Sequence, residues 1–258
     1  EAIVESGGQL SSKGGNVGGF AGALGKVTVT GAGSRWDHTN QLTLGYEGRG
    51  EMTVSAAGEV ASQSAIIASN PGSTGTATVT GSNSKWTNTQ HLFVGNRGVA
   101  SLFVQSGGEV GTGSLSVGPG GQGTMEISSG GKLTTSTAML GTNGTGGNAM
   151  VPTTGDVLVT GAGSSLIAST WIWAGSQKAE GSLTIADSAT VSINNGVFDA
   201  MTSAGLLFLG DDTVAGSAGT LNIGGKVAAA APGTLVAAGV AFNTLSDTLN
   251  FNHTATNY

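Results

Sequence analysis

The sequence is poor in cysteine, proline and charged residues. Among its 258 residues there is no cysteine, 4 are proline, and 9% are charged. The lack of cysteine excludes a disulfide framework and thiolate metal sites. The 9 Lys and Arg are scattered singly and the formal net charge is −6, which leaves no basic stripe for phosphate groups. We therefore expect no nucleic-acid partner, and no apolar run approaches the roughly 18 residues of a membrane-spanning helix.

Glycine and small or β-branched residues take the place of charge. There are 47 glycines, and Val, Leu, Ile, Thr, Ser, Ala and Asn make up most of the remainder. Such a chain is too apolar to be disordered, yet it has few residues that would keep a helix surface hydrated. Strands separated by glycine turns fit this composition better. The sequence has no initiator methionine and no signal-like start, which predicts that it is a fragment of a longer protein.

A short phrase recurs along the chain and reveals a repeat. The sequence reads VTGAGSRW at 29–36, VTGSNSKW at 79–86 and VTGAGSSL at 159–166. Apolar phrases that end in glycine recur with it at steps of 23 and 27 residues, and the steps widen to 34, 35 and 29 in the last third. The marker glycines are Gly18, Gly45, Gly95, Gly118, Gly141, Gly175, Gly210 and Gly239, with Ala68 in the same place.

Repeats of this length are typical of solenoid proteins. Each unit contains runs such as KVTVTG, QLTLG and GEMTV, which alternate apolar and hydroxyl residues with period 2. We therefore predict one all-β domain over 1–258, a right-handed parallel β-helix of about nine coils with 23 to 27 residues per coil and loop insertions. Leu42, Leu44, Leu92 and Val94 should face inward. The marker glycines should lie at corners, where a positive φ or a close approach between coils excludes a side chain.

No motif for catalysis or cofactor binding has the context that it needs. GPGGQG at 118–123 matches the glycine spacing of a dinucleotide loop, but the strand-like TMEI follows it instead of a helix. His38 aligns with Asn88 in the repeat and His91 with Gln41, so each column predicts a polar turn rather than a metal ligand. The acidic residues are spread along the chain, whereas polysaccharide lyases and hydrolases need paired acids. We expect no cofactor, no metal and no enzymatic activity.

Two kinds of position are candidates for contact with a partner. Trp36 and Trp86 lie two coils apart in one column and would form a sugar-binding strip if exposed, although Leu166 in that column favours packing. The register is also broken by seven extra residues within 142–155 and about eleven within 192–205, and a solenoid accommodates such insertions as loops. The candidate contacts in these loops are the apolar Met150 and Val151 in the first and Val197 and Phe198 in the second.

Two long segments are similar to a known class of repeat. VTGAGSRWDHTNQLTLGYEGRGEMTVSAAGEV and VTGSNSKWTNTQHLFVGNRGVASLFVQSGGEV resemble the repeats of autotransporter passenger domains, the exported β-helices of type V secretion in Gram-negative bacteria. DTLNFNHTATNY at 247–258 resembles the segment that precedes the last passenger coils in such proteins. The resemblance implies an extracellular location on the bacterial surface, in a parent anchored to the outer membrane by a C-terminal barrel beyond this segment. The implied partners are a host surface receptor or glycan, or a second copy of the protein.

These observations predict a non-catalytic β-helix that is displayed on the cell surface. It would act as a rigid stalk or as an adhesin, for host-cell attachment or for self-association. A polysaccharide-cleaving enzyme on the same fold is the alternative, and a phage tailspike-like fibre is a third reading.

Overall fold

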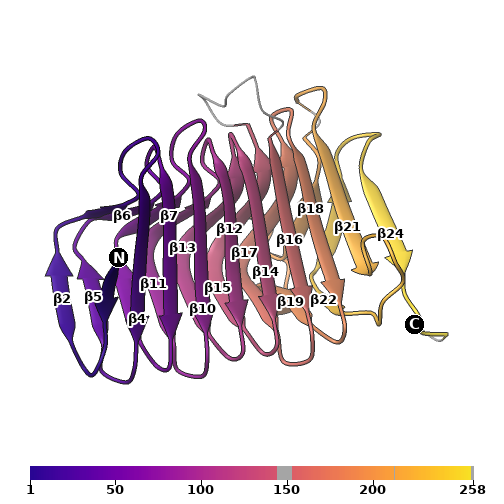
Figure 1. The fold of residues 1–258 in the computed structure, drawn as a ribbon. Helices are drawn as coiled ribbons and strands as arrows, with labels where there is room; N and C mark the ends of the chain where they lie inside the picture. Colours follow the sequence, from indigo (N-terminus) through magenta and orange to yellow (C-terminus); the bar gives the residue numbers. More distant parts are fainter. Residues whose placement is uncertain (144–152, 212, 257–258) are drawn as a thin grey trace.

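The computed structural model describes residues 1–143, 153–211 and 213–256, which form one elongated stack of β-strands (Figure 1). The one helical element among them is a 3-10 turn, η1 (Asn194–Gly196). A 10-stranded sheet runs the length of the stack. In spatial order its strands are β1 (Ala2–Val4), β4 (Leu24–Thr30), β7 (Arg49–Ser55), β10 (Thr74–Thr80), β12 (Val99–Gln105), β14 (Gln122–Ser128), β16 (Thr154–Thr160), β18 (Glu180–Ala186), β21 (Ala218–Gly224) and β24 (Thr248–Asn252).

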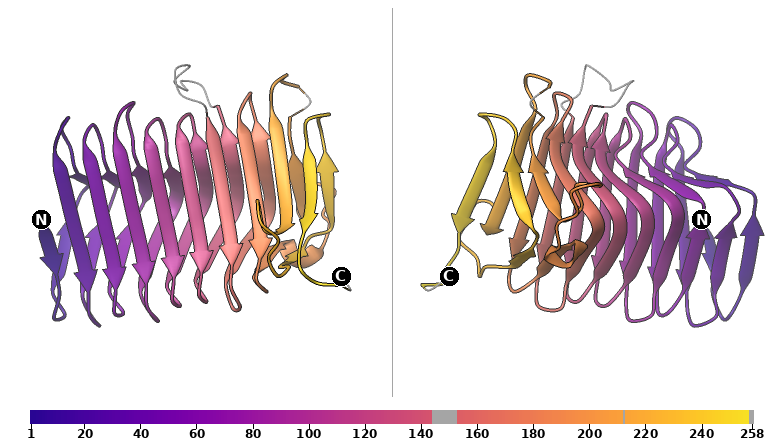
Figure 2. Two further views of the ribbon diagram at one scale, coloured as in Figure 1. Left: turned by 45° about the vertical axis from the view of Figure 1, so that its right-hand side comes forward. Right: turned by 180° about the vertical axis from the view of Figure 1, so that it is seen from behind.

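A 14-stranded sheet forms the rest of the wall and curves around the back of the molecule (Figure 2). Its main path is β2 (Gln9–Ser12), β5 (Arg35–His38), β8 (Glu59–Ser62), β11 (Lys85–Val94), β13 (Glu109–Pro119), β15 (Lys132–Thr142), β17 (Ser165–Ser176), β19 (Thr190–Ile193) and β22 (Thr234–Val236). Its branch strands are β3 (Gly15–Val17), β6 (Gln41–Leu44), β9 (Ser64–Ile67), β20 (Leu206–Leu209) and β23 (Gly239–Phe242). The long strands bend in the middle. In β11 the register shifts between Asn88 and His91, so that β11 pairs with β8 before the bend and with β9 after it.

The strands pair in parallel with their counterparts in the next coil. The chain passes along the 10-stranded sheet, returns through the other sheet and advances by one strand, in the right-handed sense that parallel crossovers favour (Figure 1). The prediction of a right-handed parallel β-helix is confirmed. The ten strands of the first sheet correspond to about ten turns, close to the nine coils expected from the markers.

The core consists of columns of like residues stacked along the axis. One column in the 10-stranded sheet is Val29, Val54, Val79 and Val104, all fully buried. The residues that were expected to face inward, Leu42, Leu44, Leu92 and Val94, are fully buried as well. Stacking in register places each apolar side chain on its equivalent in the next coil, so the periodic sequence builds a continuous core.

The marker glycines lie at corners between the two sheets, as predicted. Gly18, Gly45, Gly95, Gly118, Gly141, Gly175 and Gly210 all have φ between 67° and 78°. Ala68 takes the same conformation, with φ 58°. A Cβ on Gly95 would fall against the backbone carbonyl of Gln122 in the next coil. Both causes proposed from the sequence, a positive φ and a close approach between coils, therefore apply at these corners.

The prediction that Gly239 is the last marker is wrong. Gly239 begins β23 and pairs with Leu206, the first residue of β20. The equivalent of Gly210 is Asn243, whose backbone nitrogen donates to the carbonyl of Leu209 at 3.0 Å. The phrase LVAAG resembles a marker in composition, but the hydrogen-bond register places the corner that follows the strand four residues after Gly239, at Asn243.

Candidate functional site

The two tryptophans that were candidates for a surface strip face the interior. Trp36 is 6% exposed and Trp86 is fully buried. Their column continues in register through Val60, Val110, Leu133 and Leu166. A role for Trp36 and Trp86 in surface binding is therefore wrong, because both rings pack among aliphatic side chains. The packing role suggested by Leu166 is confirmed.

The second predicted loop is displayed on the surface. Val197 is 60% exposed and Phe198 is 54% exposed, in the segment that joins β19 to β20. Met201 in the same segment is 95% exposed. Met150 and Val151 of the first predicted loop lie outside the described residues. The loop at 194–205 therefore presents a group of apolar side chains to solvent.

Polar side chains line the inside of the bend in the second sheet. Ser62 Oγ donates to Asn88 Oδ1, and Thr135 Oγ1 donates to the carbonyl of Thr137 at 2.8 Å. Both bonds lie where the strands bend, and the bend leaves backbone and side-chain polar groups inside the wall. These bonds satisfy only part of the column, because Asn88 Nδ2 and His38 Nε2 are buried without a hydrogen-bond partner among the described residues.

His38 belongs to this interior column and is 5% exposed. Its Nδ1 lies 2.8 Å from Ser12 Oγ, and its ring meets the Trp36 ring edge-on with centroids 4.3 Å apart. Burial lowers the pKa of the His38 imidazole, although the neighbouring Asp37 carboxylate opposes this effect. The predicted polar turn is wrong, because His38 is the last residue of β5 and faces inward. Within the described ranges, no group of three His, Cys, Asp or Glu could hold a metal ion.

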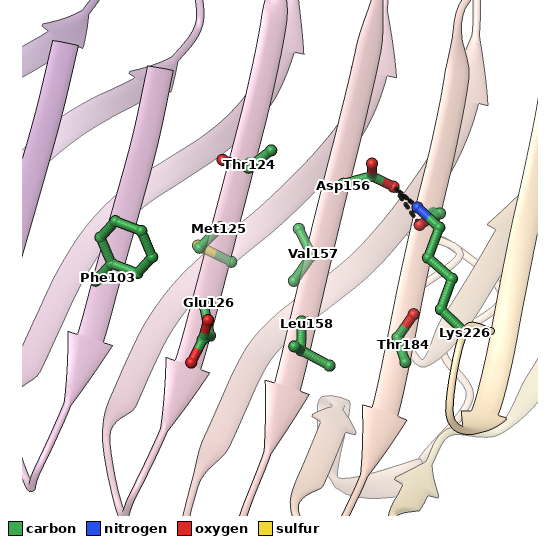
Figure 3. A pocket seen from close by; sticks show the side chains of 10 residues that line it. Phe103, Thr124, Met125, Glu126, Asp156, Val157, Leu158, Thr184 and Lys226 are labelled. Carbon is green, nitrogen blue, oxygen red and sulfur yellow. Dashed lines mark hydrogen bonds and ion pairs between the residues drawn. The ribbon is translucent and has the colours of Figure 1, made fainter. Parts of the chain in front are cut away.

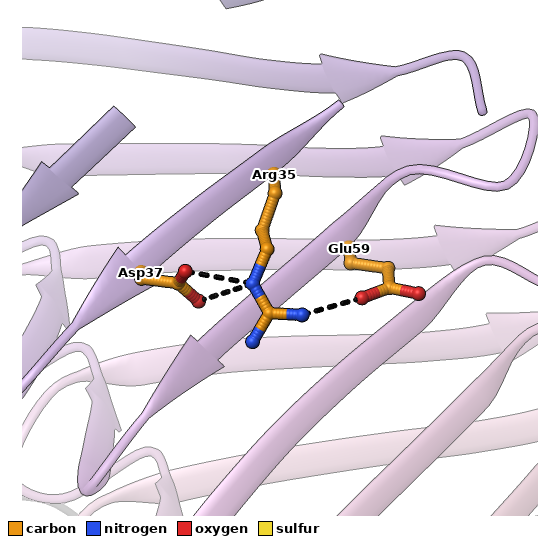
Figure 4. A network of polar contacts seen from close by, with 3 residues as sticks. All are labelled: Arg35, Asp37 and Glu59. Carbon is orange, nitrogen blue, oxygen red and sulfur yellow. Dashed lines mark hydrogen bonds and ion pairs between the residues drawn. The ribbon is translucent and has the colours of Figure 1, made fainter. Parts of the chain in front are cut away.

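Charged side chains alternate in sign along the outer surface of the second sheet. Arg35 Nε lies 2.7 Å from Asp37 Oδ2 and Arg35 Nη1 lies 2.8 Å from Glu59 Oε2 (Figure 4). Asp37, followed by Glu59, raises the pKa of the Arg35 guanidinium. The register continues the column through Lys85, Glu109 and Lys132. Because these pairs are exposed, each contributes at most about 1 kcal/mol, and the ladder is a solvated surface that favours the observed register.

Part of the outer face of the 10-stranded sheet is hollowed. There the segment 225–233, called the strap below, leaves the coil and crosses the sheet. Backbone hydrogen bonds hold it in place: Asp187 N donates to the carbonyl of Ala231 at 2.7 Å, and Gly225 N donates to that of Asn252 at 2.9 Å. The strap contributes Lys226 to the wall of the hollows beside it.

Two adjoining hollows of about 250 and 380 Å³ lie beside the strap, and together they are called the outer groove. Both are lined by Asp156, Ser182 and Lys226. The first hollow also exposes Phe103, Glu126 and Leu158 from β12, β14 and β16 (Figure 3). The second continues past Glu180, Asn222 and Asn250.

An ion pair joins the strap to the floor of the outer groove. Lys226 Nζ lies 2.7 Å from Asp156 Oδ1, and Ser182 Oγ donates to the same oxygen (Figure 3). The two charged side chains are 53% and 43% exposed, so this pair positions the strap more than it stabilises the fold. Among the described residues that line the groove, Lys226 is the one cation. Glu126 and Glu180 are not paired with a Lys or Arg there, so the net charge of the groove is negative.

The first hollow of the groove holds two acids, Glu126 and Asp156. Glu126 and Asp156 lie on neighbouring strands, in register positions two residues apart. The Asp156 carboxylate already contacts the Lys226 ammonium at 2.7 Å and accepts a hydrogen bond from Ser182 Oγ. Ser182 bonds to a carboxylate and not to a histidine, so it lacks the base that activates a nucleophilic serine.

A second exposed surface is aromatic. Trp171 and Trp173 on β17 and Phe208 on β20 point outward and are half-buried. The Trp173 and Phe208 rings stack with centroids 5.0 Å apart, and Trp173 Nε1 donates to the carbonyl of Gly210 at 2.6 Å. That the two tryptophans share a face follows from period 2, and both are partly accessible.

The sequence did not reveal the outer groove. Its wall comes from GGKVAAAAPG at 224–233, where the apolar and hydroxyl alternation stops, and that interruption is the signal that was available. The pairing of Lys226 with Asp156 depends on the path of the strap and has no periodic signature.

Comparison with known proteins identifies no relative. No family model matches the chain, and neither a curated protein nor a solved structure matches it. Among the described residues, no helix is long and apolar enough to cross a membrane. The functional interpretation therefore rests on the fold and its surfaces.

Proposed function

We propose that the chain is a non-catalytic, surface-displayed β-helix that acts as a rigid stalk or adhesin. It would serve attachment to host cells or self-association. The observation that carries the proposal is the combination of an uninterrupted parallel ladder with apolar side chains held outside it, at Val197, Phe198 and Met201. An unbroken ladder resists bending, and exposed apolar groups at a fixed place on a rigid body suit contact with a partner.

The cellular setting of this proposal comes from the repeats themselves. Their resemblance to autotransporter passengers supports a location outside a Gram-negative cell, with the parent held at the outer membrane.

One observation favours the alternative of a polysaccharide-cleaving enzyme. Glu126 and Asp156 line the same hollow from neighbouring strands, as a pair of carboxylates in a glycosidase would. Against it stands the engagement of Asp156 by Lys226 and Ser182. We therefore keep the enzyme as the second candidate, to be separated by the same experiment.

The test is attachment measured together with cleavage. Beads coated with the chain should bind cultured epithelial cells or clump with one another, and beads coated with the heat-unfolded chain should do neither. The same preparation, incubated with a panel of soluble polysaccharides, should release no new reducing ends. Absence of both attachment and clumping would overturn the stalk-adhesin proposal, and reducing ends that disappear in Glu126→Gln would establish the enzyme instead.

A further inference from the structure

The outer groove has the chemistry of a carbohydrate site. We propose that it binds a neutral oligosaccharide chain, laid across the outer face of β12, β14, β16 and β18. The proposed stalk or adhesin function names no ligand for this groove. A groove that failed to bind sugar would leave attachment through the 194–205 loop untouched.

The floor of the groove alternates apolar and carboxylate groups along the solenoid axis. Phe103 pairs in register with Glu126, and Glu126 pairs with Leu158, so the three side chains follow one another at about 4.8 Å per coil. A pyranose ring has an apolar face of C–H bonds and an edge of hydroxyl groups. An aromatic ring beside a carboxylate on a rigid sheet can therefore contact the face while it accepts hydrogen bonds from the edge.

The strap side of the groove supplies fixed polar groups. Asp156 is held by Lys226 at 2.7 Å and by Ser182, so its carboxylate is oriented before any ligand arrives. A preoriented acceptor loses little conformational entropy on binding. Lys226 also closes the side of the groove and can donate further hydrogen bonds, since an ammonium has three donors.

Charge selects among sugars. Glu126, Asp156 and Glu180 face a single ammonium, that of Lys226, among the described residues that line the two hollows. Uronate or sulfate groups would be repelled by this excess of carboxylate. A basic peptide would satisfy the charge, but it would leave the apolar Phe103 and Leu158 without a matching face. A neutral glycan satisfies both the polar and the apolar parts.

The experiment is calorimetric titration of the folded chain at 150 mM salt with four hexasaccharides and one hexapeptide. Cellohexaose, maltohexaose and hexa-N-acetylchitohexaose are the neutral probes, hexagalacturonate is the anionic probe, and hexalysine is the cationic one. We expect at least one neutral probe to bind and the two charged probes not to bind. Phe103→Ala and Glu126→Gln should each weaken that binding about tenfold, as loss of one stacking or one charge-assisted contact does.

The matched control is Lys26→Ala. Lys26 forms an ion pair with Glu51 at 3.0 Å, as Lys226 does with Asp156. Glu51 and Asp156 lie in the same column of the 10-stranded sheet, four strands apart, so the control pair is far from the strap. Lys226→Ala should weaken binding, and Lys26→Ala should leave it unchanged. Thermal melts followed by circular dichroism show that each variant is folded, and Glu126→Gln keeps the test decisive if Phe103→Ala does not fold. Binding of no neutral probe, binding of hexagalacturonate or hexalysine in its place, or binding indifferent to Glu126→Gln would overturn the proposal.

Discussion

Replacement of Gly95 by alanine isolates the close contact between coils that the fold requires. Gly95 has φ 78°, and an added Cβ would fall against the carbonyl group of Gln122 and 2.8 Å from Gly123 N. Gly22 is a matched control, because it has φ 76° and nothing within 4 Å of the position of a Cβ. The pair of variants therefore separates backbone strain from steric contact.

The two effects differ in size. A positive φ costs an alanine about 1–2 kcal/mol, and the stiffer unfolded chain offsets roughly 0.5–1 of it, so Gly22→Ala should destabilise by about 1 kcal/mol or less. Gly95→Ala adds overpacking of about 1–3 kcal/mol. It also strains the hydrogen bonds from Gly95 N to the Ile67 carbonyl at 2.9 Å and from Gln122 N to the Gly98 carbonyl at 3.0 Å, each contributing about 1 kcal/mol. We expect a total of about 3–5 kcal/mol.

The assay is urea unfolding followed by far-ultraviolet circular dichroism and by tryptophan fluorescence. Coincidence of the two signals would permit a two-state fit, and the midpoint of Gly95→Ala should then lie well below that of Gly22→Ala. Ala68 shows that one corner of the same kind accepts a Cβ. If both variants unfold at the same midpoint, the neighbouring coil yields to the added Cβ, and close approach is not what requires glycine at Gly95.

Three further predictions concern the interior and the loops. The unfolded chain takes up a proton at His38 near pH 6.5, whereas the buried imidazole does so only at lower pH. The free energy of unfolding should therefore fall as the pH drops from 7.5 to 5, and it should fall less in His38→Asn. Equal losses in the two proteins, measured by urea melts, would contradict this. Trp86→Ala should destabilise by about 3–5 kcal/mol and the outward Trp171→Ala by less; similar midpoints would refute the assigned orientations. Deletion of 196–203 should leave the melting temperature within a few degrees but reduce bead attachment, and unchanged attachment would remove this loop from the proposed function.

Much of the fold follows from the sequence, because stacked coils demand like residues at equal spacing. Val29, Val54, Val79 and Val104 are 25 residues apart and lie in one column. The prediction failed at Gly239, where it relied on the composition of a short phrase instead of on spacing. Only the hydrogen bonds distinguish a corner from the start of a strand there.

The functional surfaces were less predictable. The inward orientation of Trp36 was within reach, because it alternates with the outward-facing charged residues Arg35 and Asp37. The outer groove was not. Phe103, Asp156 and Lys226 come from two strands and the strap, and the path of the strap depends on non-periodic contacts such as that of Asp187 with Ala231.

The register of the coils underlies every surface described, and the absence of cysteine makes it directly testable. Ser101 and Thr124 are register partners whose hydroxyl oxygens lie 2.9 Å apart on the outer face. Partners in adjacent strands, about 4.8 Å apart, suit a disulfide, whereas a displacement of two residues gives about 8 Å, beyond its reach. The measurement is the mass and the non-reducing gel mobility of two double variants after mild oxidation. The predicted result is rapid intramolecular disulfide formation in Ser101→Cys/Thr124→Cys and little in Ser101→Cys/Glu126→Cys, and the reverse order would contradict the stacked register.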